Sequence, residues 1–169
     1  MTKTEWEVRG TTMKVLKVTI PMVTMVILLT FILNPVEGAA AGTGEAIFKD
    51  YQVVEVREFE VPPNVPAPDS AGRRIADEIV YQIRRYSYKF HLFDMVIIEG
   101  KREIPPDKKV LLVKGTVDAF YVRGTCAIHC QFVDKKSGHI LYKTRAKGLI
   151  FRVGEYIAKV IYLHKRGKR

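Results

Sequence analysis

The chain has 169 residues, of which 47% are hydrophobic and 10% aromatic, so it can bury a core and is not a disordered polypeptide. This length leaves room for one ordinary domain plus a tail or a targeting segment. The formal net charge of +10 is high for the size and favours anionic partners such as phospholipid headgroups, lipopolysaccharide or nucleic acid.

Residues 1–41 are predicted to be an N-terminal extension followed by a secretory signal peptide. Lys14 and Lys17 precede an apolar run from Val18 to Leu33, and the small residues 39–42 supply a cleavage zone. Met13 is a better start than Met1 for such a signal, because the residues before it have mixed charge and no periodicity.

Residues 42–169 are predicted to form a single exported α+β domain, located in the periplasm after cleavage. This part holds 24 Lys and Arg residues against 15 Asp and Glu residues, so it carries nearly all of the positive charge. The alternative is an uncleaved inner-membrane anchor over residues 15–33, which is close to the length that spans a bilayer.

The first predicted elements are a strand and a helix, separated by a proline-rich loop. Residues 51–62 have the Val and Phe content of a strand, and the four prolines of residues 62–68 end any strand or helix there. A helix is predicted from an N-cap at Asp69 or Ser70 to about Tyr86. Three isoleucines recur at helical spacing on its buried face: Ile75, Ile79 and Ile83.

Four strands and a second helix are predicted to follow, over residues 90–100, 109–122, 124–134, 139–148 and 153–169. Alternation in the strand at 109–122 places five side chains on one face: Leu111, Val113, Val117, Ala119 and Tyr121. Residues 135–138 make a hairpin turn with Gly138 at positive φ. The order is therefore β-α-β-β-β-β-α, which predicts an α+β fold: a mainly antiparallel sheet of about five strands with two helices on one face.

Both cysteines lie in one predicted strand, in the pattern Cys126-x-x-His129-Cys130. Alternation places the cysteines on the apolar face with Ile128 and Phe132, and His129 on the opposite face. Four residues of strand separate the two Cα atoms by about 13 Å, whereas a disulfide needs about 7 Å or less. Buried thiols are favoured, and a redox or metal-dependent protein that uses these three residues stays open as the alternative.

No other pattern indicates catalysis. His91, Asp94 and Glu99 are close in sequence, but no nucleophile accompanies them, and neither a phosphate-binding glycine loop nor a metal-ligand spacing occurs. We therefore predict a protein that is not an enzyme, with no catalytic residue, metal or cofactor.

Basic residues near the C-terminus predict a surface for an anionic partner. Along the fifth strand His139, Lys143, Arg145 and Lys147 share one face, opposite Ile140, Tyr142 and Ala146. If the last helix folds back, its basic end joins them. The candidate residues are Lys135, Lys136, His139, Lys143, Arg145, Lys147, Lys165 and Arg166. Nucleic acid is a disfavoured partner because this stripe lacks interleaved aromatic residues.

The export signal, "FDMV", "VKGTVDAFYV" and "CQFVDKKSGHILYK" together resemble a family of small bacterial envelope proteins of unknown function, many of them lipoproteins. The layout is similar to auxiliary components of envelope transport and assembly systems. The resemblance covers residues 51–163, although this sequence has no cysteine at the cleavage zone for a lipid anchor. The resemblance implies a fold and a compartment, and it implies no reaction. From the basic surface and the sheet edge we predict a non-enzymatic envelope domain that binds an envelope protein or an anionic lipid or glycolipid. A strand-pairing oligomer is a further possibility.

Overall fold

The computed structural model describes residues 46–167, so the predicted signal peptide or anchor lies outside the described residues. The five strands and two helices described below, and the core between them, lie within this range. A chain that begins at Gly42 therefore holds the whole of this core. Within residues 46–167, no helix is both long enough and apolar enough to cross a membrane.

The order β-α-β-β-β-β-α is confirmed, but the five-stranded sheet is mixed rather than mainly antiparallel. The sheet order is β2-β1-β3-β4-β5. Strand β1 (Val53–Val56) runs parallel to both β2 (Met95–Ile98) and β3 (Val110–Tyr121). Strands β3, β4 (Thr125–Asp134) and β5 (Ile140–Leu149) are antiparallel to one another.

Strand β1 shows no alternation of buried and exposed residues, because it lies between two parallel neighbours. Helix α2 (Ala71–Phe90) connects β1 to β2, and a crossover of that length joins parallel neighbours rather than a hairpin. All four residues of β1 are buried, because the strand lies inside the sheet with both faces covered.

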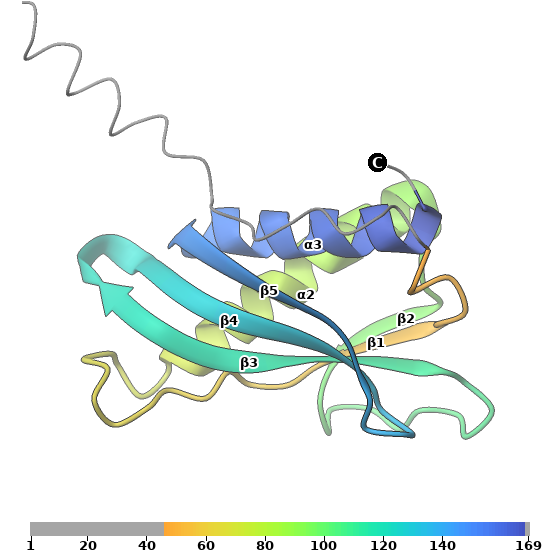
Figure 1. Cartoon of the computed structure of the whole chain (residues 1–169), viewed down its shortest axis with the longest axis horizontal. Helices are drawn as coiled ribbons and strands as arrows, with labels where there is room; N and C mark the ends of the chain where they lie inside the picture. The colour runs from red at the N-terminus through yellow and green to blue at the C-terminus, as the bar shows by residue number, and fades with distance from the viewer. Residues whose placement is uncertain (1–45, 168–169) are drawn as a thin grey trace, which may run out of the picture. The chain divides into compact units, whose positions relative to one another are not determined.

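Helices α2 and α3 (Ile150–Arg166) lie side by side on one face of the sheet (Figure 1). The isoleucine face predicted for the first helix is confirmed, since Ile75, Ile79 and Ile83 are all buried. Helix α2 continues beyond Tyr86 and stops where His91 adopts a left-handed conformation with φ of 52°. Helix α3 starts directly after β5, three residues earlier than predicted.

Two β-bulges shift the alternation of the long strands. The first, between Val117 and Ala119, brings Phe120 opposite buried Cys126 and turns Tyr121 outward, where it is 49% exposed. Ala119 pairs with Ala127, on the outward face of β4. The prediction that Ala119 and Tyr121 share the face of Val117 is therefore wrong. The second interrupts β5, so that Ile140 pairs with Val133 rather than following the inward phase of Tyr142.

Candidate anion-binding surface

The β4–β5 hairpin forms where the sequence predicted it. Asp134 closes the turn, because its carboxylate accepts bonds from the backbone amide of Ser137 at 2.8 Å and from the hydroxyl of Ser137 at 3.0 Å. Gly138 adopts a φ of 72°, which glycine reaches without steric cost. Tyr51 donates a 2.8 Å bond to the same carboxylate and so fixes the hairpin to the chain before β1.

Strand β5 presents a row of cations on the sheet face opposite the helices. Lys143, Arg145 and Lys147 are exposed, whereas the alternating residues Thr144 and Ala146 are buried. We call Lys143, Arg145 and Lys147 the β5 strip. Alternation places the β5 strip as predicted, although the bulge separates it from His139, which precedes the strand.

A polar chain across three strands holds the middle of the β5 strip. The Asp118 carboxylate lies 2.7 Å from Nδ1 of His129, and Nε of Arg145 contacts Nε2 of His129. Arg145 can only donate, so in this arrangement Nε2 of His129 faces a donor and Nδ1 faces the Asp118 carboxylate. The guanidinium therefore occupies the position from which an Asp–His pair would activate a nucleophile.

The register adds one cation that sequence reasoning missed. Lys114 on β3 and Lys143 on β5 both pair with Gln131 of β4, so all three lie in one row of the sheet. The short connection between β3 and β4 sets the register of the two strands, so the row that contains Lys114 could in principle be read from the sequence. The bulge after Val117 shifts that register by one residue and hides the pairing.

Lys135 and Lys136 lie at the β4–β5 turn. The ammonium of Lys135 is 2.5 Å from the carboxylate of Glu55, a residue only 2% exposed on the same sheet face. Lys135 therefore neutralises the buried carboxylate of Glu55, so the charge of Lys135 contributes little to binding an external anion. Lys136 and His139 are exposed at the turn.

The structure does not bring Lys165 and Arg166 to the β5 strip. Both lie at the C-terminal end of α3, on the helix side of the sheet. The ammonium of Lys165 donates to the carbonyls of Lys49 at 2.8 Å and Tyr51 at 2.5 Å, and burial lowers its pKa. Arg166 donates to the carbonyl of Phe90 at 2.7 Å. These two residues therefore fasten the last helix to the rest of the domain.

The cysteines face the core, as alternation predicted. Both are buried free thiols, and His129 projects to the other face of β4. Burial raises the pKa of Cys126 to about 11 and raises that of Cys130 as well. In the described part of the chain, no cluster of three His, Cys, Asp or Glu side chains is placed to hold a metal ion.

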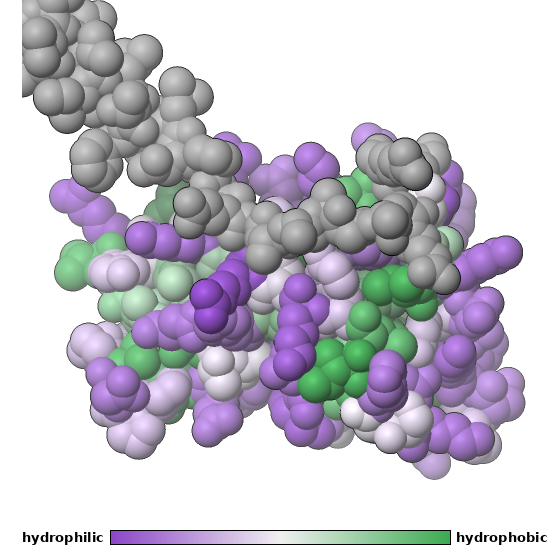
Figure 2. All heavy atoms as spheres, viewed as in Figure 1, coloured by the Kyte–Doolittle hydropathy of each residue, from purple (hydrophilic) through white to green (hydrophobic). Residues whose placement is uncertain are grey.

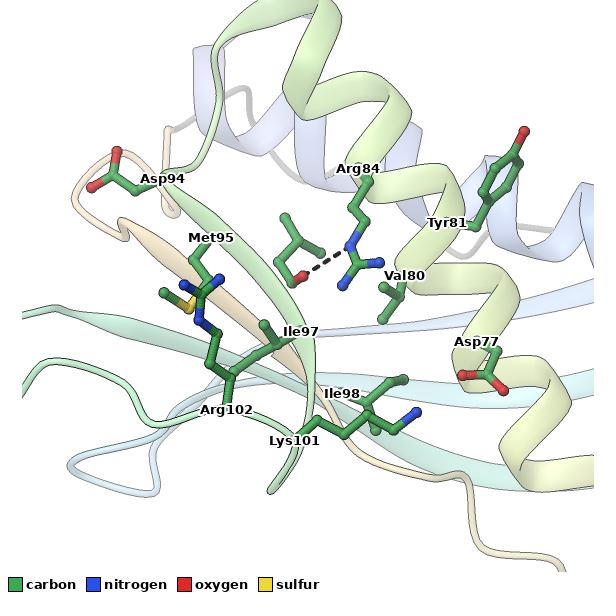
Figure 3. Close-up of a pocket in the computed structure, with 11 residues that line it drawn as sticks. Asp77, Val80, Tyr81, Arg84, Asp94, Met95, Ile97, Ile98, Lys101 and Arg102 are labelled. Atoms are coloured by element: carbon green, nitrogen blue, oxygen red, sulfur yellow. Dashed lines mark hydrogen bonds between the residues drawn. The ribbon is translucent and has the colours of Figure 1, made fainter.

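A hollow of about 600 Å³ lies between α2 and the edge strand β2 (Figure 3). Arg84 reaches across it and donates a 3.0 Å bond to the carbonyl of Val96, while the amide of Lys101 bonds the carbonyl of Ile98 at 3.2 Å. These donors occupy two carbonyls of the edge, so β2 is protected from pairing with another strand. Strand β5, at the opposite edge, carries the β5 strip instead.

No family model matches the sequence, and no curated protein matches it. Several solved structures resemble the fold. The PelC dodecamer from Paraburkholderia phytofirmans is 13% identical with a TM-score of 0.48, over 80% of this chain and 98% of that one. A putative neuraminyllactose-binding hemagglutinin homolog from Helicobacter pylori is 15% identical with a TM-score of 0.37, over 75% of this chain and 86% of that one.

A third such structure is protein XCC0632 from Xanthomonas campestris, of the family of unknown function DUF330. It is 8% identical with a TM-score of 0.39, over 70% of this chain and 84% of that one. At these identities and TM-scores, the likenesses carry no argument about ligand, partner or assembly.

Proposed function

We propose that the chain is a non-enzymatic domain of the bacterial cell envelope that binds an acidic protein or an anionic lipid through the β5 strip. One observation carries the proposal. Within residues 46–167, three exposed cations stand two residues apart on an edge strand, and none of them forms an ion pair with a carboxylate. Lys114 and Lys136 extend the positive field around them.

The non-enzymatic part of the proposal is supported by what surrounds the reactive groups. Both thiols are buried with raised pKa values, so little thiolate forms at neutral pH. The Asp118–His129 pair ends on Arg145 rather than on a hydroxyl or a thiol.

The periplasmic location and a role beside an envelope transport or assembly system are also part of this proposal. They are supported by the signal-like residues 14–42 and by the resemblance of residues 51–163 to small envelope proteins. Inner-membrane anchoring by residues 15–33 is the alternative location, and both place the domain next to anionic lipids and envelope proteins.

Charge reversal tests the proposal directly. The chain from Gly42 to Arg169 is compared with its Lys143→Glu, Arg145→Glu, Lys147→Glu triple variant for sedimentation with phosphatidylglycerol vesicles and for capture of envelope proteins. The control, Lys89→Glu, Lys101→Glu, Lys159→Glu, makes the same charge change at exposed residues away from β5.

We expect the β5 triple variant to lose binding, and the control variant to keep most of it. Equal loss in both variants would show a dependence on net charge rather than on this site. Unchanged lipid and protein binding in the β5 variant would contradict the proposal.

Strand addition at β5 is a second candidate function. Strand β5 is ten residues long and pairs only with β4 among the described strands, whereas the β2 edge is four residues long and capped. The cations of β5 oppose pairing between identical copies and favour an acidic partner strand. Light scattering separates the two kinds of partner: a mass that rises with concentration would show pairing between copies. A constant monomer mass would contradict pairing between copies and would leave an acidic partner strand as the occupant.

A further inference from the structure

Exposed hydrophobic side chains gather at the end of the domain where β3 turns into β4 and where β5 runs into α3. Tyr121 is 49% exposed, Val122 88%, Leu149 41% and Phe151 45%. We call these four residues the apolar tip. Figure 1 shows both junctions at the same end of the molecule, and Figure 2 shows hydrophobic atoms at the surface there.

The apolar tip is continuous across the strands. Tyr121 pairs with Thr125, which in turn pairs with Leu149, so the three residues form one row. Leu149 and Phe151 also line one hollow of about 410 Å³ with the hairpin apex. The tip projects outward instead of forming a closed pocket, so its natural partner is an extended surface.

The backbone of the hairpin apex holds a cation in an unfavourable conformation. Arg123 has φ of 70° and ψ of 19°, a left-handed conformation that is rare for residues other than glycine, asparagine and aspartate. Gly124 next to it has φ of 74° and carries no such cost. Strained residues gather at binding sites, and Arg123 is itself exposed at the apex. The strain therefore suggests that the guanidinium of Arg123 contacts a group outside the chain.

Further cations lie over the aromatic rings of the apolar tip. The ammonium of Lys147 is 5.9 Å from the ring centre of Tyr121, and the guanidinium of Arg152 is 4.9 Å from that of Phe151. Aromatic rings with cations at their edges suit the boundary between headgroups and acyl chains.

Two acidic side chains nearby have cationic partners: Asp77 lies 4.0 Å from Arg73, and Glu155 accepts a 3.0 Å bond from Arg152. Glu78, which lines the same hollow as Arg123, accepts a 2.7 Å bond from the neutral amide of Gln82 and keeps its charge. Among residues 46–167, neither Arg123 nor Lys147 forms an ion pair with any of these carboxylates.

We infer that the apolar tip inserts into the headgroup region of an anionic phospholipid bilayer, with Arg123 and Lys147 on lipid phosphates. Val122 and Tyr121 enter first because they stand at the hairpin apex, and Leu149 and Phe151 widen the apolar footprint. The inference goes beyond the proposed function, since of the β5 strip it uses only Lys147.

The test places an environment-sensitive fluorophore at the apolar tip of the full chain. Native Cys126 and Cys130 are buried, so Val122→Cys and, as a control, Tyr88→Cys each accept one nitrobenzoxadiazole label. Residues 122 and 88 are matched in exposure, at 88% and 89%, but Tyr88 lies on α2. Each protein is mixed with vesicles of phosphatidylcholine alone or with added phosphatidylglycerol.

We expect a blue shift and protection from aqueous quenchers at residue 122 in anionic vesicles, and neither change at residue 88. Arg123→Asn keeps the left-handed turn but removes the cation, and we expect it to reduce the ratio of inserted to free tip about fivefold.

A label at residue 122 that stays in water, or that shifts equally in neutral vesicles, would overturn the inference. A shift that follows protein concentration without lipid would replace it with contact between two copies. The β5 strip keeps Lys143, Arg145 and Lys147 in these variants, so failure here is distinguishable from failure of the proposed function.

Discussion

The two edges of the sheet are protected from unwanted strand pairing in different ways. Strand β2 is four residues long, and Arg84 together with the Lys101 amide occupies its carbonyls. Strand β5 is ten residues long and carries three exposed cations in alternation. Both devices discourage random strand pairing, but only the cations of β5 leave the edge attractive to an acidic partner. An edge protected by charge is selective, whereas an edge protected by a cap is closed.

The largest expected effect is on stability, when the aromatic cluster that packs against β5 is removed. Phe132 is fully buried and contacts the rings of Phe48 and Tyr142, so Phe132→Ala should lower the free energy of unfolding by about 3–5 kcal/mol. Denaturant unfolding followed by circular dichroism measures it. Val122→Ala, at an exposed position, is the control and should change stability by less than about 0.5 kcal/mol. A small effect at Phe132 would show that β5 does not rest on this cluster.

A smaller, pH-dependent effect is expected at the turn that starts β5. The Ser137 backbone amide, followed by the Tyr51 and Ser137 hydroxyls, lowers the pKa of Asp134. The ionised Asp134 carboxylate therefore stabilises the folded state fully above the unfolded-state pKa near 3.9. This stabilisation is lost as the pH falls through the lower folded-state pKa.

Asp134→Asn should therefore cost about 1–2 kcal/mol at pH 7, and the difference from the parent should shrink towards pH 3. Thermal unfolding at several pH values measures this. A difference that is constant from pH 7 to pH 3 would assign the loss to packing rather than to the charge.

Opening the β2 edge should have a modest effect on stability. Arg84→Gln removes the donor to the Val96 carbonyl and should cost about 1 kcal/mol, while Arg74→Gln on the same helix should cost little. If the cap closes this edge, Arg84→Gln should also make the domain associate at high concentration in light scattering. A stable monomer without its cap would show that the shortness of β2 is protection enough.

The smallest expected effect is at the thiols, where native protein should not react. With the pKa of Cys126 raised to about 11 and Cys130 fully within the core, an aromatic disulfide reagent at pH 8 should label neither until denaturant is added. Prompt labelling of either cysteine would reopen the redox alternative and would contradict the inward face of β4.

Sequence reasoning predicted the element order and the burial of the cysteines, because both depend on local periodicity. The Ile75–Ile83 face and the alternation from Cys126 to Phe132 needed no long-range information. The parallel pairing of β1 did, since a short, fully buried strand shows no alternation that separates parallel from antiparallel neighbours.

The candidate site was predicted only in part, for a related reason. Lys143, Arg145 and Lys147 obey simple alternation, so their common face was predictable. The bulges that displace Tyr121 and Ile140 depend on how the strands pair, which local sequence does not show. The position of Lys165, away from the β5 strip, depends on how α3 packs against the chain before β1. Lys114 and the Asp118–His129–Arg145 chain were missed because they join residues on different strands.

The central claim is that partners bind at β5 and not at β2. Amide resonances of the chain from Gly42 to Arg169 should be followed by NMR while phosphatidylglycerol nanodiscs, or an acidic envelope protein, are added. We expect shifts and line broadening to concentrate on residues 143–147 and their neighbours on β4, with residues 95–98 unchanged. Changes centred on β2, or none at either edge, would contradict the account.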